Sequence, residues 1–127
     1  MTLADTDVLI DFLAGREPAA ERVARELESG NLWTTVITRF EMLSGARGAR
    51  ETQIVGELLD SMKIVSLDVS AANRAAAVRR ALERKGIGIG MADSLIAGIV
   101  LHVSGTLLTR NLRHFERVEG LDLARVE

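Results

Sequence analysis

Acidic side chains and one amide side chain recur in this chain at points where an apolar stretch gives way to the start of a helix. Asp5 and Asp7 follow the apolar segment at the N-terminus, and Glu41, Asp93 and Asn111 hold similar positions further along. The carboxyl ends of parallel strands lie along one edge of a sheet, where α/β folds bind their ligands. The spacing therefore predicts an acidic pocket, and such a pocket needs a divalent cation.

Asp93 gives the sharpest indication of a cation site. It lies in the most apolar helix that we expect, over residues 92–103, and no Lys or Arg stands within one helical turn of it. A buried ionised carboxylate is costly unless it is paired or metal-bound, and several carboxylates at one edge repel one another without a cation. Oxygen ligands suit Mg²⁺ or Mn²⁺. His102 and His114 are poor candidates, since one lies late in an apolar helix and the other in a basic turn.

Each of these residues also has a purely structural explanation. Asp5 or Asp7 can cap the first helix, Asp93 suits the positive end of a helix dipole, and Asn111 can cap a short helix. Residues 38–41 fit a capping box, in which Glu41 reaches back to the N-cap. Their gathering at one edge favours the cation site instead. A cation there could activate water and stabilise charge on a phosphate oxygen, so phosphodiester hydrolysis is the leading reaction.

Strand-like and helix-like segments alternate along the chain, which is typical of an α/β domain with a parallel sheet. The expected strands cover residues 1–4, 32–35, 63–67 and 106–109, with an edge strand over 121–126. The expected helices cover residues 7–14, 18–29, 38–43, 51–61, 70–85 and 92–103, with a helical turn over 111–115. Gly15, Gly30 and Gly86 should end helices, Ser70 should begin one, and Phe40, Leu43 and Ile54 should face inward.

Length and composition predict one globular domain over residues 1–127. The chain is 47% apolar, contains one proline, and carries a formal net charge of -2. That charge exerts no global pull on nucleic acid, so RNA binding would have to be local, at the basic residues of segments 79–85 and 110–117. The chain has no cysteine, no signal-peptide pattern and no apolar run near the ~20 residues that span a bilayer. We therefore expect a cytoplasmic protein with no membrane partner.

Four segments in order carry a family resemblance: LADTDVLID (3–11), VITRFEMLSG (36–45), ADSLIA (92–97) and LTRNLRHF (108–115), the last followed by Gly120 and Leu121. Together they resemble the PIN domain family, and more closely its VapC-type toxins. The resemblance implies a three-layer α/β/α sandwich with a short, mostly parallel central sheet. It further implies a Mg²⁺-dependent RNA endonuclease, with Mn²⁺ able to substitute. The implied partners are an RNA substrate, a VapB-type antitoxin and a second copy of the chain.

The resemblance also assigns roles to individual residues. It implies that Asp5, Asp93 and Glu41 bind the metal, Glu41 directly or through water, while a metal-bound or carboxylate-oriented water attacks the RNA phosphate. Asn111 falls where many relatives place a fourth catalytic acid. The supporting positions that it implies are Thr6, Asp7 and Thr109, where Asp7 stands at a position that Asn or Ser often holds.

Other functions remain open at this stage. A PIN-like fold could act mainly as a binding module that holds an antitoxin. The segment Asp5–Leu9 also resembles the first motif of haloacid-dehalogenase-type phosphatases, with Asp5 as nucleophile, although Leu9 stands where Thr or Val is expected and no acid lies near Ile89. A receiver-type phosphorylation switch would need a lysine after the strand that ends at Thr109, and none follows.

Overall fold

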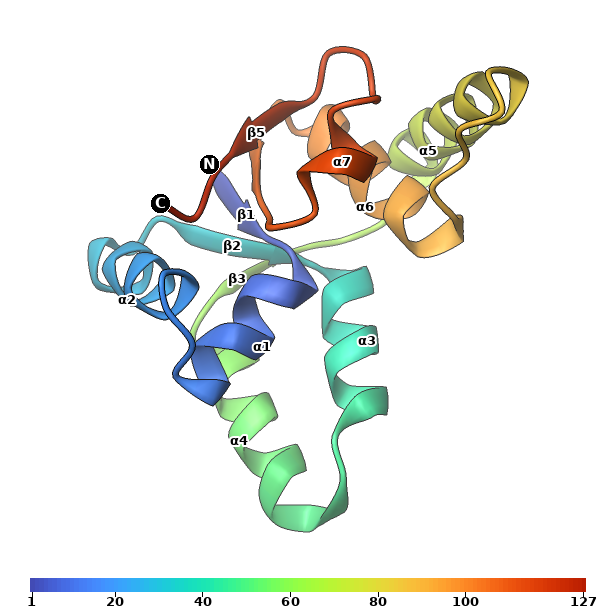
Figure 1. Cartoon of the computed structure of the whole chain (residues 1–127). Helices are drawn as coiled ribbons and strands as arrows, with labels where there is room; N and C mark the ends of the chain where they lie inside the picture. The colour runs from blue at the N-terminus through green and yellow to red at the C-terminus, as the bar shows by residue number, and fades with distance from the viewer.

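A sheet of five parallel strands forms the centre of the computed structural model, which describes residues 1–127 (Figure 1). The strand order is β3-β2-β1-β4-β5. The strands are β1 (Thr2–Ala4), β2 (Leu32–Thr35), β3 (Lys63–Val65), β4 (Thr106–Leu108) and β5 (Asp122–Ala124). The α/β expectation is confirmed, and the sheet is wholly rather than mostly parallel. The edge strand β5 also pairs in parallel, with β4.

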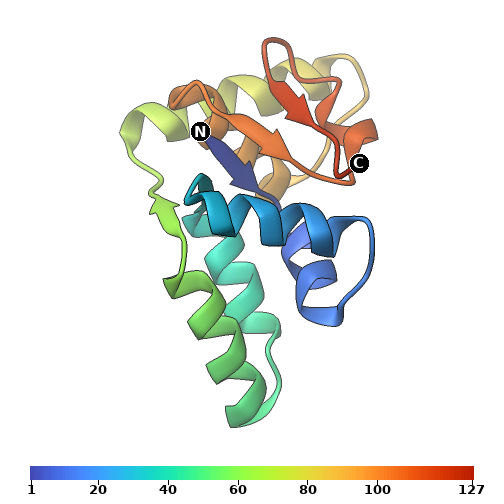
Figure 2. The ribbon, with the colours of Figure 1, turned by 90° about the vertical axis from the view of Figure 1, so that its left-hand side faces the viewer.

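Seven helices connect and cover the strands. They are α1 (Thr6–Ala14), α2 (Ala19–Ser29), α3 (Val36–Gly45), α4 (Gly48–Asp60), α5 (Val69–Arg84), α6 (Met91–His102) and α7 (Leu112–Phe115). Figures 1 and 2 show helices on both sides of the sheet, which gives the three layers. No helix combines the length and the apolar character that crossing a bilayer requires.

The neighbouring strands β1 and β4 lie between two apolar clusters of the core. Ala4 and Leu108 face a cluster built with α1 to α4, while their neighbours Leu3 and Leu107 face a cluster built with α5, α6 and α7. All four side chains are buried, because successive residues of a strand point to opposite faces and here both faces are covered. This double burial explains why the last two residues of both strands are apolar.

Helices α5 and α6 pack backbone to backbone at Gly98. A Cβ atom at Gly98 would lie 2.5 Å from the backbone nitrogen of Ala75, a separation that real structures do not tolerate. The glycine therefore allows the two helices to approach, and it sets the position of α6, whose first turn carries Asp93.

Helices α5 and α3 are capped by other residues than the sequence predicts. Helix α5 is capped by Asp68, not by Ser70, because the Asp68 carboxylate accepts a hydrogen bond from the Ala71 N–H at 2.8 Å. Helix α3 begins two residues earlier than expected, and its N-cap is Thr35, whose hydroxyl accepts from the Thr38 N–H at 3.1 Å. The predicted capping box over residues 38–41 is therefore wrong.

The predicted inward faces of α3 and α4 also need correction. Phe40 is 69% exposed, because Thr38 and Met42 are the buried residues of α3 and Phe40 lies between them on the opposite side. Ile54 is exposed beside the buried Val55. By contrast, Gly15 adopts the expected left-handed conformation, with φ of 70°, and ends α1 as predicted.

Candidate functional site

The candidate site lies at the carboxyl ends of β1 and β4. The chain leaves β1 toward β2 and β3 on one side and returns to β4 and β5 on the other, so the strand order reverses between β1 and β4. Asp5 follows β1 and Thr109 follows β4. The Thr109 hydroxyl donates to Asp5 Oδ2 at 2.7 Å, and the Asp5 N–H donates to the Leu108 carbonyl at 2.9 Å. This switch point holds the first predicted acid in place.

Asp5 is a buried carboxylate, with only 6% of its surface exposed. It caps α1, because its Oδ1 accepts from the Thr6 N–H at 2.8 Å. Burial raises the pKa of Asp5 to about 7; the carboxylates of Asp7 and, more weakly, Asp93 add to this shift, and hydrogen bonds from Thr109 and Thr6 oppose it. No Lys or Arg pairs with Asp5. Its negative charge therefore lacks a cationic partner within the protein.

Glu41 is tied to the start of α1 through a hydroxyl group. Thr6 Oγ1 donates to Glu41 Oε1 at 2.7 Å and lies 3.2 Å from Thr38 Oγ1, which is one turn before Glu41 on α3. Thr6 is also the residue whose backbone binds Asp5. The structure thus brings Thr6, Glu41 and Asp5 together as neighbours, although Glu41 makes no direct contact with Asp5.

Asp93 contacts His114, and His114 in turn contacts Asn111. His114 Nδ1 lies 3.1 Å from Asp93 Oδ2 and 3.0 Å from Asn111 Nδ2. The Asp93 side chain is 25% exposed, so its predicted burial is wrong: the buried face of α6 starts at the next residue, Ser94. The predicted side-chain cap at Asn111 is also wrong, because its amide contacts His114 and no backbone N–H of α7.

His114 is the residue that the sequence reasoning missed. Its basic neighbours in the sequence make it a poor candidate for a metal ligand, yet it is the partner of Asp93. Its position three residues after Asn111, at the start of a helical turn, places the two side chains on one face, and this spacing was the available signal.

Asp7 holds the loop between β4 and α7. Its Oδ2 accepts from the Arg110 N–H at 3.1 Å, while its Oδ1 is buried and has no hydrogen-bond partner. Burial raises the pKa of Asp7. The Arg110 guanidinium pairs instead with the buried Asp11, with Nε 2.6 Å from Oδ2. Arg110 is therefore occupied by Asp11, which the sequence did not single out.

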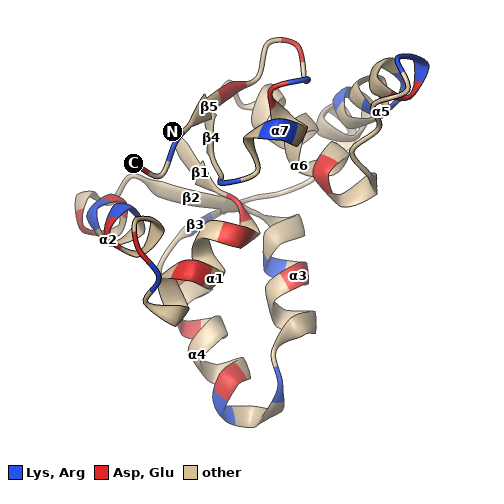
Figure 3. Ribbon diagram, in the orientation of Figure 1, with Lys and Arg blue, Asp and Glu red and all other residues tan.

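The acids surround the end of β1 without forming a ready ligand cage. Figure 3 shows acidic residues on α1, on α3 and at the start of α6. No three Asp, Glu or His side chains lie close enough together to hold one metal ion between them. The donor chemistry nevertheless suits a hard cation: Asp5 and Glu41 have no cationic partner, and Asp7 leaves one buried oxygen unsatisfied. The candidate ligands therefore fit Mg²⁺ or Mn²⁺ by the type of their donor atoms.

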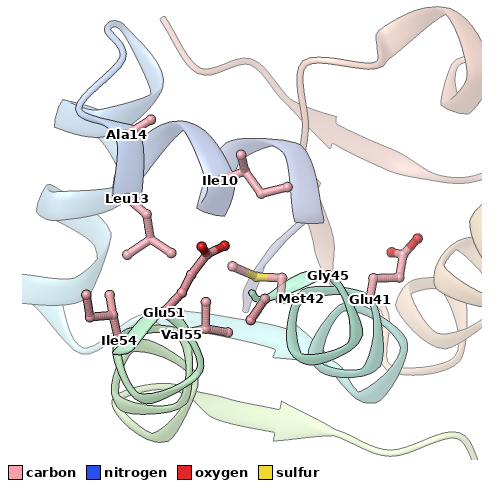
Figure 4. A pocket seen from close by; sticks show the side chains of 10 residues that line it. Ile10, Leu13, Ala14, Glu41, Met42, Gly45, Glu51, Ile54 and Val55 are labelled. Carbon is pink, nitrogen blue, oxygen red and sulfur yellow. The ribbon is translucent and has the colours of Figure 1, made fainter. Parts of the chain in front are cut away.

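An apolar groove of about 410 Å³ borders the site between α1, α3 and α4. Figure 4 shows Ile10, Leu13 and Ile54 lining it, with Glu41 at one end. Ile10, Leu13 and Ile54 are all partly exposed, so the groove presents apolar surface to solvent directly beside the acids.

The chain is similar to known proteins over almost its whole length. The family model of the PIN domain matches residues 2–121. The tRNA(fMet)-specific endonuclease VapC of Shigella flexneri is 28% identical over 94% of this chain and 92% of its own length. Ribonuclease VapC10 of Mycobacterium tuberculosis is 33% identical over 95% of this chain and 90% of its own. DNA-bound VapBC from Salmonella typhimurium superposes with a TM-score of 0.86 at 25% identity, over 99% of this chain and 98% of that chain.

Proposed function

The chain belongs to the PIN domain family, and from this membership we propose that it is a divalent-metal-dependent RNA endonuclease and the toxin of a toxin–antitoxin pair. The observation that carries the proposal is the buried Asp5 carboxylate at the switch point, which has no cationic partner and has Asp93 near enough to raise its pKa. The names of similar proteins agree, since they include ribonucleases and an endonuclease of the VapC group. The phosphatase alternative through Asp5 loses its support, because the match is to the PIN domain.

In this proposal Asp5, Glu41 and Asp93 hold Mg²⁺ or Mn²⁺. Asn111 completes the set of catalytic side chains in the place of a fourth acid. When bound, the cation supplies a polarised water and stabilises the charge that builds on the phosphate oxygens. The carboxylates provide the negative charge that attracts it, and one fewer acid at Asn111 keeps that charge lower than four carboxylates would.

The supporting residues keep the carboxylates in orientation. Thr109 binds Asp5 Oδ2, and Thr6 binds Glu41 Oε1 through its hydroxyl and Asp5 Oδ1 through its backbone. Asp7 holds the backbone of Arg110, which precedes Asn111. These contacts remove rotational freedom from the acids before a substrate arrives, and such positioning lowers the entropic part of the activation barrier.

We further propose a VapB-type antitoxin as the protein partner, with the apolar groove as its binding surface. The groove exposes Ile10, Leu13 and Ile54 and ends at Glu41, so an amphipathic segment lying in it would also reach the acids. The similar Salmonella typhimurium structure is a VapBC complex. The homodimer implied by the resemblance stays a prediction, and analytical ultracentrifugation of the free chain tests it.

The test is cleavage of a structured RNA by the purified chain in Mg²⁺, in EDTA, and with the variant Asp93→Asn in Mg²⁺. We expect cleavage only by the unmodified chain in Mg²⁺. Asp122→Asn is the matched control, because Asp122 is an exposed acid on β5 and should cleave normally. Equal cleavage in all reactions would refute metal-dependent hydrolysis at this site. Binding of the antitoxin without any cleavage would favour the binding-module function.

A further inference from the structure

We propose that His114 is a positioning residue, which holds the Asp93 carboxylate in the orientation needed to bind the cation. This inference rests on the proposed metal-dependent function and adds a residue to it. The observation behind it is the contact of a single atom, His114 Nδ1, with both Asp93 Oδ2 at 3.1 Å and Asn111 Nδ2 at 3.0 Å.

The Asp93 carboxylate has no other side-chain partner. Among the ion pairs and side-chain hydrogen bonds of the structure, Asp93 takes part only in the contact with His114. Its side chain is partly exposed and lies in the first turn of α6, so without the imidazole it could rotate into solvent. Ordering a free carboxylate when the cation binds would cost conformational entropy, and the histidine removes that cost beforehand.

The imidazole adds a polar contact between two helical elements that already share one apolar cluster. Asp93 belongs to α6, whereas His114 belongs to α7, which is anchored by the buried Phe115. Because α7 follows β4, the contact connects Asp93 to the strand end that carries Thr109 and thereby to Asp5. The histidine thus sets the position of one carboxylate relative to the other.

His114 Nδ1 cannot donate a hydrogen bond to Asp93 and accept one from Asn111 at the same time. Nδ1 either carries a hydrogen, which it donates to Asp93, or a lone pair, which accepts from the Asn111 amide. The ionised carboxylate is the stronger acceptor, so the Nδ1–H form directed at Asp93 is favoured. In this form Nδ1 does not accept a hydrogen bond from the Asn111 amide.

The chain provides a matched control in a second histidine–aspartate pair. His102 Nε2 lies 3.3 Å from Asp68 Oδ2, and both side chains are partly exposed. This pair joins the end of α6 to the start of α5 and includes none of the proposed site residues. Loss of His102 therefore measures what the removal of such a pair does to the protein in general.

The experiment measures Mn²⁺ affinity of the full chain by isothermal titration calorimetry or electron paramagnetic resonance, without RNA. We expect His114→Ala to weaken Mn²⁺ binding by about tenfold or more, as changes in residues that orient metal ligands generally do. His114→Asn should restore most of the affinity, because its amide nitrogen can occupy the place of Nδ1. His102→Ala should bind Mn²⁺ as the unmodified chain does. RNA cleavage by His114→Ala should recover when the Mn²⁺ concentration is raised.

Folding is checked by circular dichroism and thermal unfolding. The His114 side chain is 44% exposed, so we expect the alanine variant to fold. If it does not, His114→Phe keeps a ring of similar size without a ring nitrogen, and its Mn²⁺ affinity decides the question in the same way.

The possible failures can be told apart. Unchanged Mn²⁺ affinity in a folded His114→Ala or His114→Phe variant, with normal RNA cleavage by the unmodified chain, would overturn the role of His114 and leave the nuclease function intact. An equal loss in His102→Ala would also overturn it, because the effect would then be a general one. If the unmodified chain neither binds Mn²⁺ nor cleaves RNA, the proposed function fails, and the inference fails with it.

Discussion

Thr109 Oγ1 donates a hydrogen bond to Asp5 Oδ2 at 2.7 Å, although 104 positions separate the two residues along the chain. Both are buried at the ends of neighbouring strands. We expect Thr109→Val to lower the free energy of unfolding by about 1–3 kcal/mol, because it leaves a buried carboxylate oxygen without its donor. RNA cleavage should fall as well, since Asp5 loses its orientation. Urea unfolding and a cleavage assay measure the two effects.

Thr34→Val is the matched control for Thr109→Val. Thr34 is equally buried, and its hydroxyl donates to the Ala4 carbonyl at 2.7 Å, away from any carboxylate. It should lose comparable stability while the folded protein still cleaves RNA. Thr109→Ser should retain activity. A Thr109→Val variant as active as Thr34→Val would show that the hydrogen bond to Asp5 does not matter for cleavage.

The raised pKa of Asp5 predicts how stability depends on pH. In the unfolded chain Asp5 ionises near 3.8, but in the folded protein burial keeps it protonated up to about 7. Between these values the folded state binds more protons, so the free energy of unfolding falls as pH rises from about 4 to 7. Asp5→Asn removes this titration. It should therefore stabilise the protein above pH 7 by a few kcal/mol, on the order of 4 at most, and have little effect near pH 4.

The same Asp5→Asn variant should lose RNA cleavage, since it lacks the central ligand. Urea unfolding at pH 4, 6 and 8 measures the stability difference, and the exposed residue Asp122 provides the control variant Asp122→Asn. If the unmodified chain and Asp5→Asn show parallel stability profiles over this range, the Asp5 carboxyl does not titrate as its burial implies.

Two helical glycines should respond in opposite directions to alanine. At Gly98 a Cβ would meet the Ala75 backbone at 2.5 Å, so Gly98→Ala should destabilise the protein by about 1–3 kcal/mol or more through overpacking between α5 and α6. At Gly56, in α4, a Cβ would meet nothing within 4 Å, and Gly56→Ala should stabilise by roughly 0.5–1 kcal/mol. Thermal unfolding compares them. Similar stability of both variants would mean that α5 and α6 are not in close contact.

The apolar groove predicts which substitutions in this chain weaken its binding to the antitoxin. Ile10→Asp and Leu13→Asp place a charge among exposed apolar side chains of the groove and should weaken antitoxin binding by about 2 kcal/mol or more if these residues lie at the centre of the interface. Val69→Asp alters an apolar residue on α5 that is more exposed than either groove residue, and this variant should bind the antitoxin normally. Titration calorimetry with the VapB-type antitoxin measures the affinity of each variant. Unchanged binding by both groove variants would place the partner elsewhere.

Much of the fold follows from the sequence alone, because its determinants are local. Alternating apolar strands and helices predict a parallel α/β sheet, and the structure confirms each expected strand within a few residues. Gly15 and Gly30 end helices as predicted, since few other residues adopt positive φ. Local reasoning failed where two nearby residues compete for one role, as Thr35 and Thr38 do at the start of α3. The inward face of α3 was also mistaken, because the buried residues are Thr38 and Met42, and Phe40 lies between them on the exposed side.

The sequence by itself therefore determined which segments carry the acids and that Asp5 follows the first strand. Glu41 and Asp93 lie on α3 and α6 and not at strand ends. Only the tertiary structure decided how those acids are partnered. Asp5 pairs with Thr109 across the sheet, Asp93 with His114 across two helices, and Arg110 with Asp11 instead of Asp5. The backbone hydrogen bonds of a helix join residues that are close in the chain, so the sequence predicts them. The partner of a buried charge is a side chain that is distant in the sequence, and only the packing of the fold brings it within about 3 Å.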